Sequence, residues 1–125
     1  MLQHRVIPAL LLRNNGLVKT TRFKDPKYVG DPINAIRIFN EKEVDELMVL
    51  DITASKENQE PNYEMIDQIA GECFMPLAYG GGIRSVEQAQ RIFASGVEKI
   101  CIQTAALVNL QLVRALADRF GSQSI

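Results

Sequence analysis

The sequence has few of the residues that bind metals or cross-link small folds. It contains no tryptophan, one histidine (His4) and two cysteines, Cys73 and Cys101. A lone histidine without a Cys/His cluster argues against a zinc site, and we expect neither a metal nor another cofactor. Both cysteines lie in or beside apolar runs, so buried free thiols are expected rather than a disulfide.

The chain also lacks an excess of one charge and a long hydrophobic run. Its 14 Lys and Arg residues nearly balance 15 Asp and Glu residues, which gives a net charge of −1. Nucleic acids and anionic membranes attract basic proteins, so neither is an expected partner. No apolar stretch approaches the roughly 18 residues that span a bilayer. The apolar start, Met1 to Leu12, has no small-residue cleavage site, and a cytoplasmic location is expected.

What the chain does have is a regular alternation of strand-like and helix-like segments. With 125 residues, 46% of them hydrophobic, it reads as one globular domain over residues 1–125. Apolar runs without alternation are typical of strands that are buried on both faces in a parallel sheet. Four such runs occur: Arg5–Leu12, Glu46–Ile52, Phe74–Tyr79 and Lys99–Gln103.

Helices are predicted between and after these strands. Asp31-Pro32 is an N-cap followed by a first-turn proline, and Ser85 with Gln88 forms a capping box. Four helices are predicted: one that begins at Pro32, one over Tyr63–Glu72, one that runs from the capping box to Ala94, and one that is capped by Asn109 and ends at Phe120. The segment Arg13–Gly30 is interpreted as a long polar loop. This order predicts either an open doubly wound sheet or a barrel. The absence of G-x-G-x-x-G after Leu12 weakens the dinucleotide-binding interpretation.

Small residues follow the third and fourth predicted strands. Gly80, Gly81 and Gly82 precede a capped helix, so their amides can point at an anion, although a tight turn with positive φ would also require glycine. Gln103 and Thr104 follow the fourth strand in the same way. Carboxyl ends of neighbouring parallel strands meet at one rim, so a shared phosphate site is predicted there.

Charged residues mark both ends of the predicted strands. Asp51 ends the second strand and is either a general acid/base or a loop cap for Thr53 or Ser55. Lys19 could reach an anionic ligand, or it is a solvated loop lysine. Arg5, Glu46 and Lys99 stand at the opposite, amino ends of three strands, and they form either a salt-bridge plug or a polar gate for a small molecule.

These motifs together resemble the cyclase subunit family of imidazole glycerol phosphate synthase (HisF). The resemblance rests on Arg5-Val-Ile-Pro, Gly16-Leu-Val-Lys19, Gly30-Asp-Pro32, Asp45-Glu-Leu47, Leu50-Asp-Ile-Thr-Ala-Ser55, Gly80-Gly-Gly-Ile83 and Thr104-Ala-Ala106. The family is a (β/α)₈ barrel with two-fold internal repetition, a lyase/synthase. The resemblance therefore implies an α/β fold, a (β/α)4 half of a TIM barrel with parallel strands and outer helices.

The resemblance also implies roles for the candidate residues. Lys19 and Asp51 correspond to catalytic positions, and Gly81, Gly82, Gln103 and Thr104 to a phosphate site. Arg5, Glu46 and Lys99 correspond to the gate through which ammonia from a glutaminase partner enters the barrel. The chain end, Gly121 to Ile125, resembles the start of a fifth strand.

Two departures from the family pattern bear on activity. The catalytic Asp of the first strand corresponds to Leu11, which cannot transfer protons, and a phosphate-loop Asn corresponds to Gln103. Leu11 with Phe23–Gly30 is more similar to the branch linked to surface-polysaccharide (lipopolysaccharide) biosynthesis, which passes ammonia to acetamidino sugar formation. The alternative is a non-catalytic phosphate-binding half-barrel or an inactive fragment.

A half-barrel would leave its first and fourth strands as open edges and its concave face in water. The residues that would line that face are expected among the apolar residues Val6, Leu10, Leu12, Met48, Leu50 and Ile102. We therefore expect a homodimer.

Overall fold

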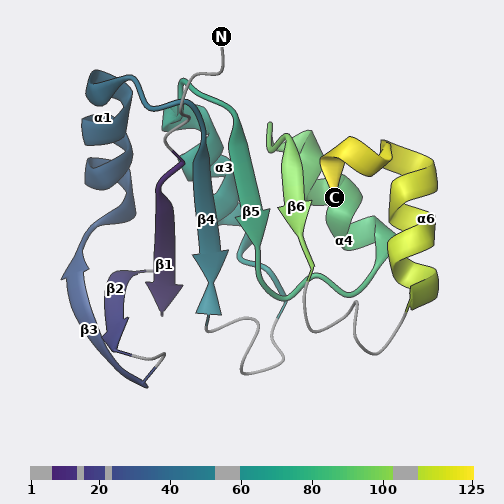
Figure 1. The fold of residues 1–125 in the computed structure, drawn as a ribbon, viewed down its shortest axis with the longest axis horizontal. Helices are drawn as coiled ribbons and strands as arrows, with labels where there is room; N and C mark the ends of the chain where they lie inside the picture. The colour runs from purple at the N-terminus through teal and green to yellow at the C-terminus, as the bar shows by residue number, and fades with distance from the viewer. Residues whose placement is uncertain (1–6, 14–15, 22–23, 53–59, 103–109) are drawn as a thin grey trace, which may run out of the picture.

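A computed structural model describes residues 7–13, 16–21, 24–52, 60–102 and 110–125, with only the backbone described within 13–29. Its strands form a single sheet in the order β3-β2-β1-β4-β5-β6 (Figure 1). Four of them, β1 (Ala9–Arg13), β4 (Leu47–Asp51), β5 (Leu77–Gly80) and β6 (Lys99–Cys101), are mutually parallel neighbours.

Helices follow each of these parallel strands along the chain. They are α1 (Pro32–Lys42), α3 (Tyr63–Glu72), α4 (Val86–Ala94) and α6 (Leu110–Phe120), with a final 3₁₀ turn η1 (Ser122–Ser124). Alternating parallel strands and helices form a (β/α)4 half of a TIM barrel, as the sequence predicted. None of the described helices is long and apolar enough to cross a membrane.

The segment interpreted as a polar loop is instead largely a hairpin, so that prediction was wrong. Strands β2 (Gly16–Thr21) and β3 (Lys24–Gly30) pair antiparallel with each other, and β2 pairs with β1. The hairpin is held by backbone hydrogen bonds, which do not depend on apolar side chains. Because its sequence is polar and lacks apolar alternation, the pattern did not indicate strands. The predicted open edge at the first strand is also corrected, because β1 is internal and the edges are β3 and β6.

Side-chain caps fix where the helices begin. The Asp31 carboxylate accepts from the Ile33 amide at 2.8 Å, and the Asn62 side chain accepts from the Met65 amide at 3.1 Å. At α4 the Ser85 hydroxyl accepts from the Gln88 amide at 3.2 Å, while the Gln88 side chain accepts from the Arg84 amide at 2.6 Å. These bonds confirm the predicted caps of α1 and α4.

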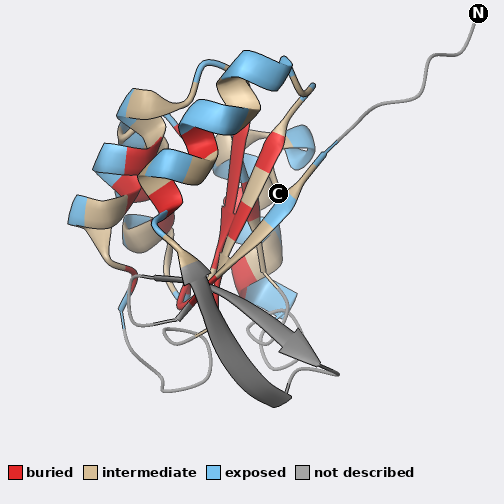
Figure 2. Ribbon diagram, turned by 90° about the vertical axis from the view of Figure 1, so that its left-hand side faces the viewer, coloured by how far each residue is buried: buried red, intermediate tan, exposed pale blue. Residues whose placement is uncertain are grey.

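The core lies between the sheet and its helix layer. Figure 2 shows that most helical residues lie on one side of the buried strands. Strand residues Leu47, Val49, Tyr79 and Ile100 pack there against helix residues Ile36, Ile66, Ile69, Ile92 and Leu116, all buried. The opposite side of the four parallel strands corresponds to the inside of a barrel.

Helices α1 and α3 are joined by polar contacts at one end. The Asn40 amide group donates to the Glu72 carbonyl at 2.7 Å and accepts from the Phe74 amide at 3.0 Å. Arg37 forms an exposed ion pair with the Glu72 carboxylate at 3.3 Å. Asn40 thereby fixes the turn that leads from α3 into β5.

Candidate functional site

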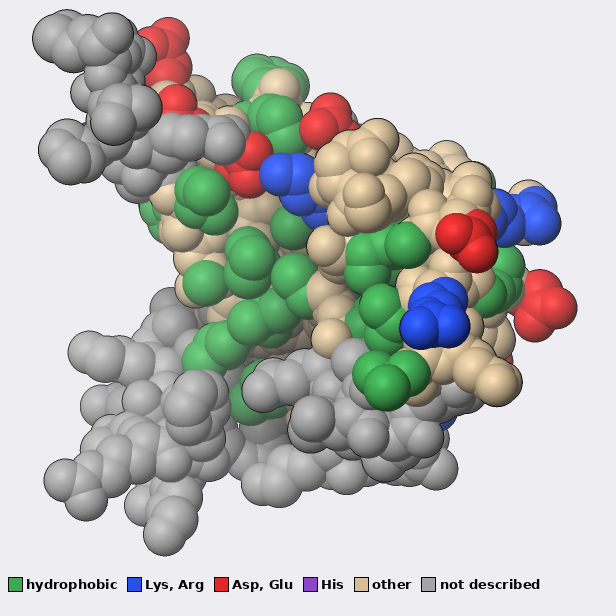
Figure 3. Space-filling model, turned by 45° about the vertical axis from the view of Figure 1, so that its right-hand side comes forward, with side chains coloured by type: hydrophobic (Ala, Val, Ile, Leu, Met, Phe, Trp, Pro, Cys, Tyr) green, Lys and Arg blue, Asp and Glu red, His purple; other side chains and the backbone are tan. Residues whose placement is uncertain are grey.

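The inner face of the four parallel strands carries two rows of residues in register. Strand pairing aligns Ala9, Met48, Ala78 and Lys99 in one row and Leu11, Leu50, Gly80 and Cys101 in the next. Because side chains alternate along a strand, these rows face away from the helix-side core that contains Leu47 and Val49. Figure 3 shows hydrophobic side chains gathered in a hollow on this side of the molecule.

The apolar residues of this inner face are only partly those expected. Met48 and Leu50 belong to it, as predicted. Leu12 is 2% exposed in the helix-side core, and Leu10 and Ile102 pack against that core. The expected list thus included three residues of the other side, because a run that is apolar throughout has no alternation that assigns its residues to one face. Val6 lies outside the described residues.

A charged pair lies at the amino end of the inner face. The Lys99 ammonium lies 3.7 Å from the Glu46 carboxylate, with side-chain exposures of 46% and 13%. Glu46 directly precedes β4, whereas Lys99 begins β6, so the lysine reaches across the intervening strand β5, where Ala78 lies beside it in register. The structure thus brings together two of the three predicted gate residues, and Arg5 lies outside the described residues.

The glycine-rich loop lies at the carboxyl end of β5. Gly81 and Gly82 adopt positive φ angles of 134° and 72°. A Cβ on Gly80 would lie 2.9 Å from Leu50 Cδ2, and one on Gly81 would lie 2.6 Å from the Asp51 carbonyl oxygen. Glycine is therefore required both for conformation and for close packing, and the loop leads directly to the capped start of α4.

Two side chains hold the carbonyl groups of this loop. The Tyr79 hydroxyl donates to the Gly81 carbonyl at 3.1 Å, and the Arg84 guanidinium donates to the Gly82 carbonyl at 3.3 Å. Sequence reasoning missed both residues. The available signal was that both residues are close in sequence to the three glycines. A tyrosine hydroxyl two residues before a glycine can reach the backbone of that glycine.

Asp51 lies beside the same loop but is nearly buried. It ends β4, is 7% exposed, and falls by alternation on the side of Leu47 and Val49. Its backbone contacts Gly81, so the carboxyl ends of β4 and β5 form one packed rim. The catalytic role of Asp51 stays a prediction.

The remaining predicted residues cannot be placed around this rim. Gln103 and Thr104 lie outside the described residues, as do the possible capping partners of Asp51, Thr53 and Ser55. The backbone of Lys19 lies in β2, paired with Lys27, and its side chain is not described. Leu11, in contrast, occupies the inner face next to Leu50.

Both cysteines are free thiols, as predicted, although each is half-buried rather than buried. Burial raises the pKa of the Cys73 thiol and of the Cys101 thiol. Neither therefore has the lowered pKa of a cysteine nucleophile. Within the described ranges, no three His, Cys, Asp or Glu side chains are placed to hold a metal ion.

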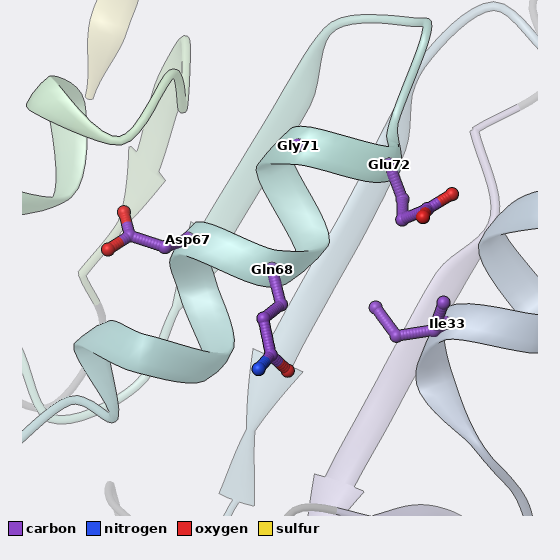
Figure 4. A pocket seen from close by; sticks show the side chains of 5 residues that line it. All are labelled: Ile33, Asp67, Gln68, Gly71 and Glu72. Carbon is purple, nitrogen blue, oxygen red and sulfur yellow. The ribbon is translucent and has the colours of Figure 1, made fainter.

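A groove of about 340 Å³ lies on the outer side, between α1 and α3. Ile33, Asp67, Gln68, Gly71 and Glu72 line it. Figure 4 shows Asp67 pointing away from Ile33, and its carboxylate accepts a hydrogen bond from the Ser95 hydroxyl. None of the candidate site residues lines this groove, so it is separate from the inner face.

Similarity to known proteins extends over the whole chain. Residues 5–125 match the model of the family described as histidine biosynthesis protein. Two similar relatives are provisionally named imidazole glycerol phosphate synthase subunits: hisF2 of Pseudomonas aeruginosa, 68% identical, and HisF of Leptospira borgpetersenii, 57% identical. The subunit HisF of Streptococcus mutans is 38% identical. Each match covers 100% of this chain and 50%, 49% and 50% of the respective relative, so the chain spans about half their length.

Proposed function

Because this chain belongs to the histidine biosynthesis protein family, we propose that it acts as half of a cyclase-type barrel that receives ammonia and binds a phosphorylated ligand. One observation carries the proposal: a charged pair and a glycine-rich loop lie at opposite ends of one sheet face. The Glu46–Lys99 pair is at the amino end, and the loop Gly80–Gly82 is at the carboxyl end. When the face is closed into a barrel, it would conduct a small molecule from one end to the other.

Ammonia is the molecule that suits the polar opening. It is small and uncharged, and it can exchange hydrogen bonds with a carboxylate and an ammonium. The Glu46–Lys99 contact of 3.7 Å is long and partly exposed, so separating the pair requires little energy. Arg5 is proposed as a third member of this gate. A glutaminase would supply the ammonia by hydrolysing glutamine.

The phosphorylated ligand would bind at the other end. Gly81 and Gly82 allow an anion to approach the backbone, and the start of α4 adds the positive end of a helix dipole. Gln103 and Thr104 are proposed to complete the site, and Lys19 and Asp51 are proposed as its catalytic groups.

Leu11 favours an amidating variant of the family activity over imidazole formation. It lies on the inner face between Val18 and Leu50 in register, in the position that corresponds to the family's catalytic Asp. An alkyl side chain can transfer no proton, whereas the gate and the phosphate loop do not need this acid. The proposed product is therefore an amidated sugar of surface-polysaccharide synthesis.

The glutaminase would dock at the amino ends of the strands. Two exposed apolar residues lie there: Ile7, 43% exposed before β1, and Phe74, 85% exposed between α3 and β5. Exposed aromatic side chains are frequent anchors of protein interfaces. Asn40 holds the Phe74 backbone in place, so the ring is presented by a fixed turn.

A second copy of this chain is the proposed cover of the inner face. The face is apolar at its centre, and it carries both a carboxylate and an ammonium, so it is complementary to itself in charge. A two-fold arrangement would duplicate the gate and the phosphate loop.

The test combines the two ends of the face. In the first experiment, inorganic phosphate is titrated into the ¹⁵N-labelled chain. In the second, a glutaminase subunit of an imidazole glycerol phosphate synthase is assayed for ammonia release with and without this chain. The proposal predicts phosphate-dependent shifts of the Gly81 and Gly82 amides and glutaminase stimulation. Lys99→Ala should reduce that stimulation, while the matched control Lys42→Ala, at the end of α1, should not.

The outcomes separate the candidate functions. Phosphate binding without any effect on the glutaminase would favour the non-catalytic phosphate-binding half-barrel, to which Leu11 also points. Absence of both effects would refute the proposal. If Lys42→Ala and Lys99→Ala reduced the glutaminase stimulation equally, the gate would play no specific role.

A further inference from the structure

The orientation of one amide in the phosphate loop depends on a side chain that lies outside it. A peptide unit is planar and trans, so its carbonyl and the following N–H point in opposite directions. The Gly81 carbonyl and the Gly82 amide belong to the same unit. Since the Tyr79 hydroxyl donates to the Gly81 carbonyl at 3.1 Å, it also fixes the Gly82 N–H to point away from the phenol.

The phenol is held firmly enough to do this. Tyr79 is 2% exposed, and its ring packs in the core between the sheet and the helices. Burial raises the pKa of Tyr79 above its ordinary value, and the negative charge of Asp51 raises it further. The hydroxyl therefore remains protonated, and remains a donor, at any pH at which the protein would work.

Gly81 itself is confined on another side. A Cβ at this position would meet the Asp51 carbonyl oxygen at 2.6 Å and the Asp51 Cβ at 2.9 Å. The backbone at Gly81 thus lies against the end of β4 while its carbonyl is held by Tyr79. Without the hydrogen bond, the peptide between Gly81 and Gly82 could rotate, because glycine on both sides permits many conformations.

We propose that Tyr79 is a positioning residue for anion binding, whose hydroxyl aims the Gly82 amide at a phosphate group. The inference rests on the proposed binding of phosphate at Gly80–Gly82 and names a residue on which that binding depends. Tyr79 does not touch the anion. It acts by holding one peptide unit in the binding orientation, so that the amide need not be reoriented when phosphate arrives.

The test is a titration of the ¹⁵N,¹³C-labelled chain with inorganic phosphate, in the original sequence and in two variants. Tyr79→Phe keeps the buried ring and removes only the hydroxyl. Tyr63→Phe is the matched control, because Tyr63 lies at the start of α3, where its ring stacks with Arg91 at 3.9 Å. We expect Tyr79→Phe to weaken phosphate binding by about fivefold, the equivalent of one neutral hydrogen bond, and Tyr63→Phe to leave it unchanged.

A second readout distinguishes positioning from general loss of structure. Without phosphate, Tyr79→Phe should shift the carbonyl carbon resonance of Gly81 and the amide of Gly82, while core resonances around Ile69 and Ile92 stay in place. Equal phosphate affinity in Tyr79→Phe and the original chain would overturn the inference and leave the proposed function standing. If the original chain binds no phosphate, the proposed function fails and the inference fails with it.

Discussion

Gly81 combines two constraints that only glycine satisfies at this position. Its φ of 134° lies in a region that side chains rarely adopt, and a Cβ would overlap the Asp51 backbone at 2.6 Å. The nearest atom, the Asp51 carbonyl oxygen, belongs to the main chain, so it cannot move aside without disturbing β4. We predict that Gly81→Ala lowers the free energy of unfolding by at least about 2 kcal/mol, measured by urea denaturation.

Gly71 provides the matched control for this substitution. It lies in α3, and a Cβ there would meet nothing within 4 Å. Gly71→Ala should therefore be neutral or stabilising by up to about 1 kcal/mol, because alanine favours a helix over glycine. Similar effects of the two substitutions would contradict the account of the loop.

For single residues, the sequence predicted local motifs better than contacts between different strands. The three glycines and the Ser85–Gln88 capping box were predictable because each motif is local. The burial of Asp51 and the bond from Tyr79 to Gly81 were not, because they depend on how β4 and β5 lie side by side. The Glu46–Lys99 pair was predictable from strand ends alone, since parallel strands bring their amino ends together.

The joint between α1 and α3 illustrates how elements are fixed to one another. Asn40 uses both its donor and its acceptor on the backbone that follows α3, at 2.7 and 3.0 Å. We predict that Asn40→Ala lowers the free energy of unfolding by about 1–3 kcal/mol, because two backbone groups lose their partners. Thermal and urea unfolding measure the change.

Arg37 supplies the comparison for that joint. It also bridges α1 and α3, but its ion pair with Glu72 is solvent-exposed. The pKa of Arg37 is raised by its hydrogen bond to Glu72, yet water screens the pair, so Arg37→Ala should change stability little. A larger loss for Arg37→Ala than for Asn40→Ala would reverse the ranking that the structure gives.

Helices were predicted more accurately than strands. The range Tyr63–Glu72 and the ends at Ala94 and Phe120 agree with α3, α4 and α6, because caps and glycines mark helix ends. The hairpin of β2 and β3 was missed because it is held by backbone pairing between these two strands and between β2 and β1, which leaves no apolar pattern in the sequence. The expected strand over Phe74–Tyr79 begins only at Leu77, where β5 enters the sheet.

At the scale of the whole fold, the described residues form a barrel half whose inner face is not covered by any described helix (Figure 1). The sequence left a barrel and an open doubly wound sheet undecided until the family resemblance was considered. Composition could not separate them because both need apolar parallel strands. In the structure most helical residues lie on one side of the sheet, as in a barrel, whereas a doubly wound sheet carries helices on both faces (Figure 2).

If a second copy covers this face, a charge placed at its centre should separate the copies. Leu50 lies in the inner row between Leu11 and Gly80. We predict that Leu50→Lys yields a monomer, because an unpaired ammonium buried in an apolar interface is strongly unfavourable. Ile38→Lys, at a 53% exposed position on α1, should leave the assembly unchanged, and light scattering reports both masses.

The proposed pairing of two half-barrels is tested most directly by the mass of the original chain in solution. Light scattering on a sizing column, over a wide range of concentration, should give about twice the chain mass of 14.0 kDa. A single species at 14.0 kDa throughout that range would contradict the pairing.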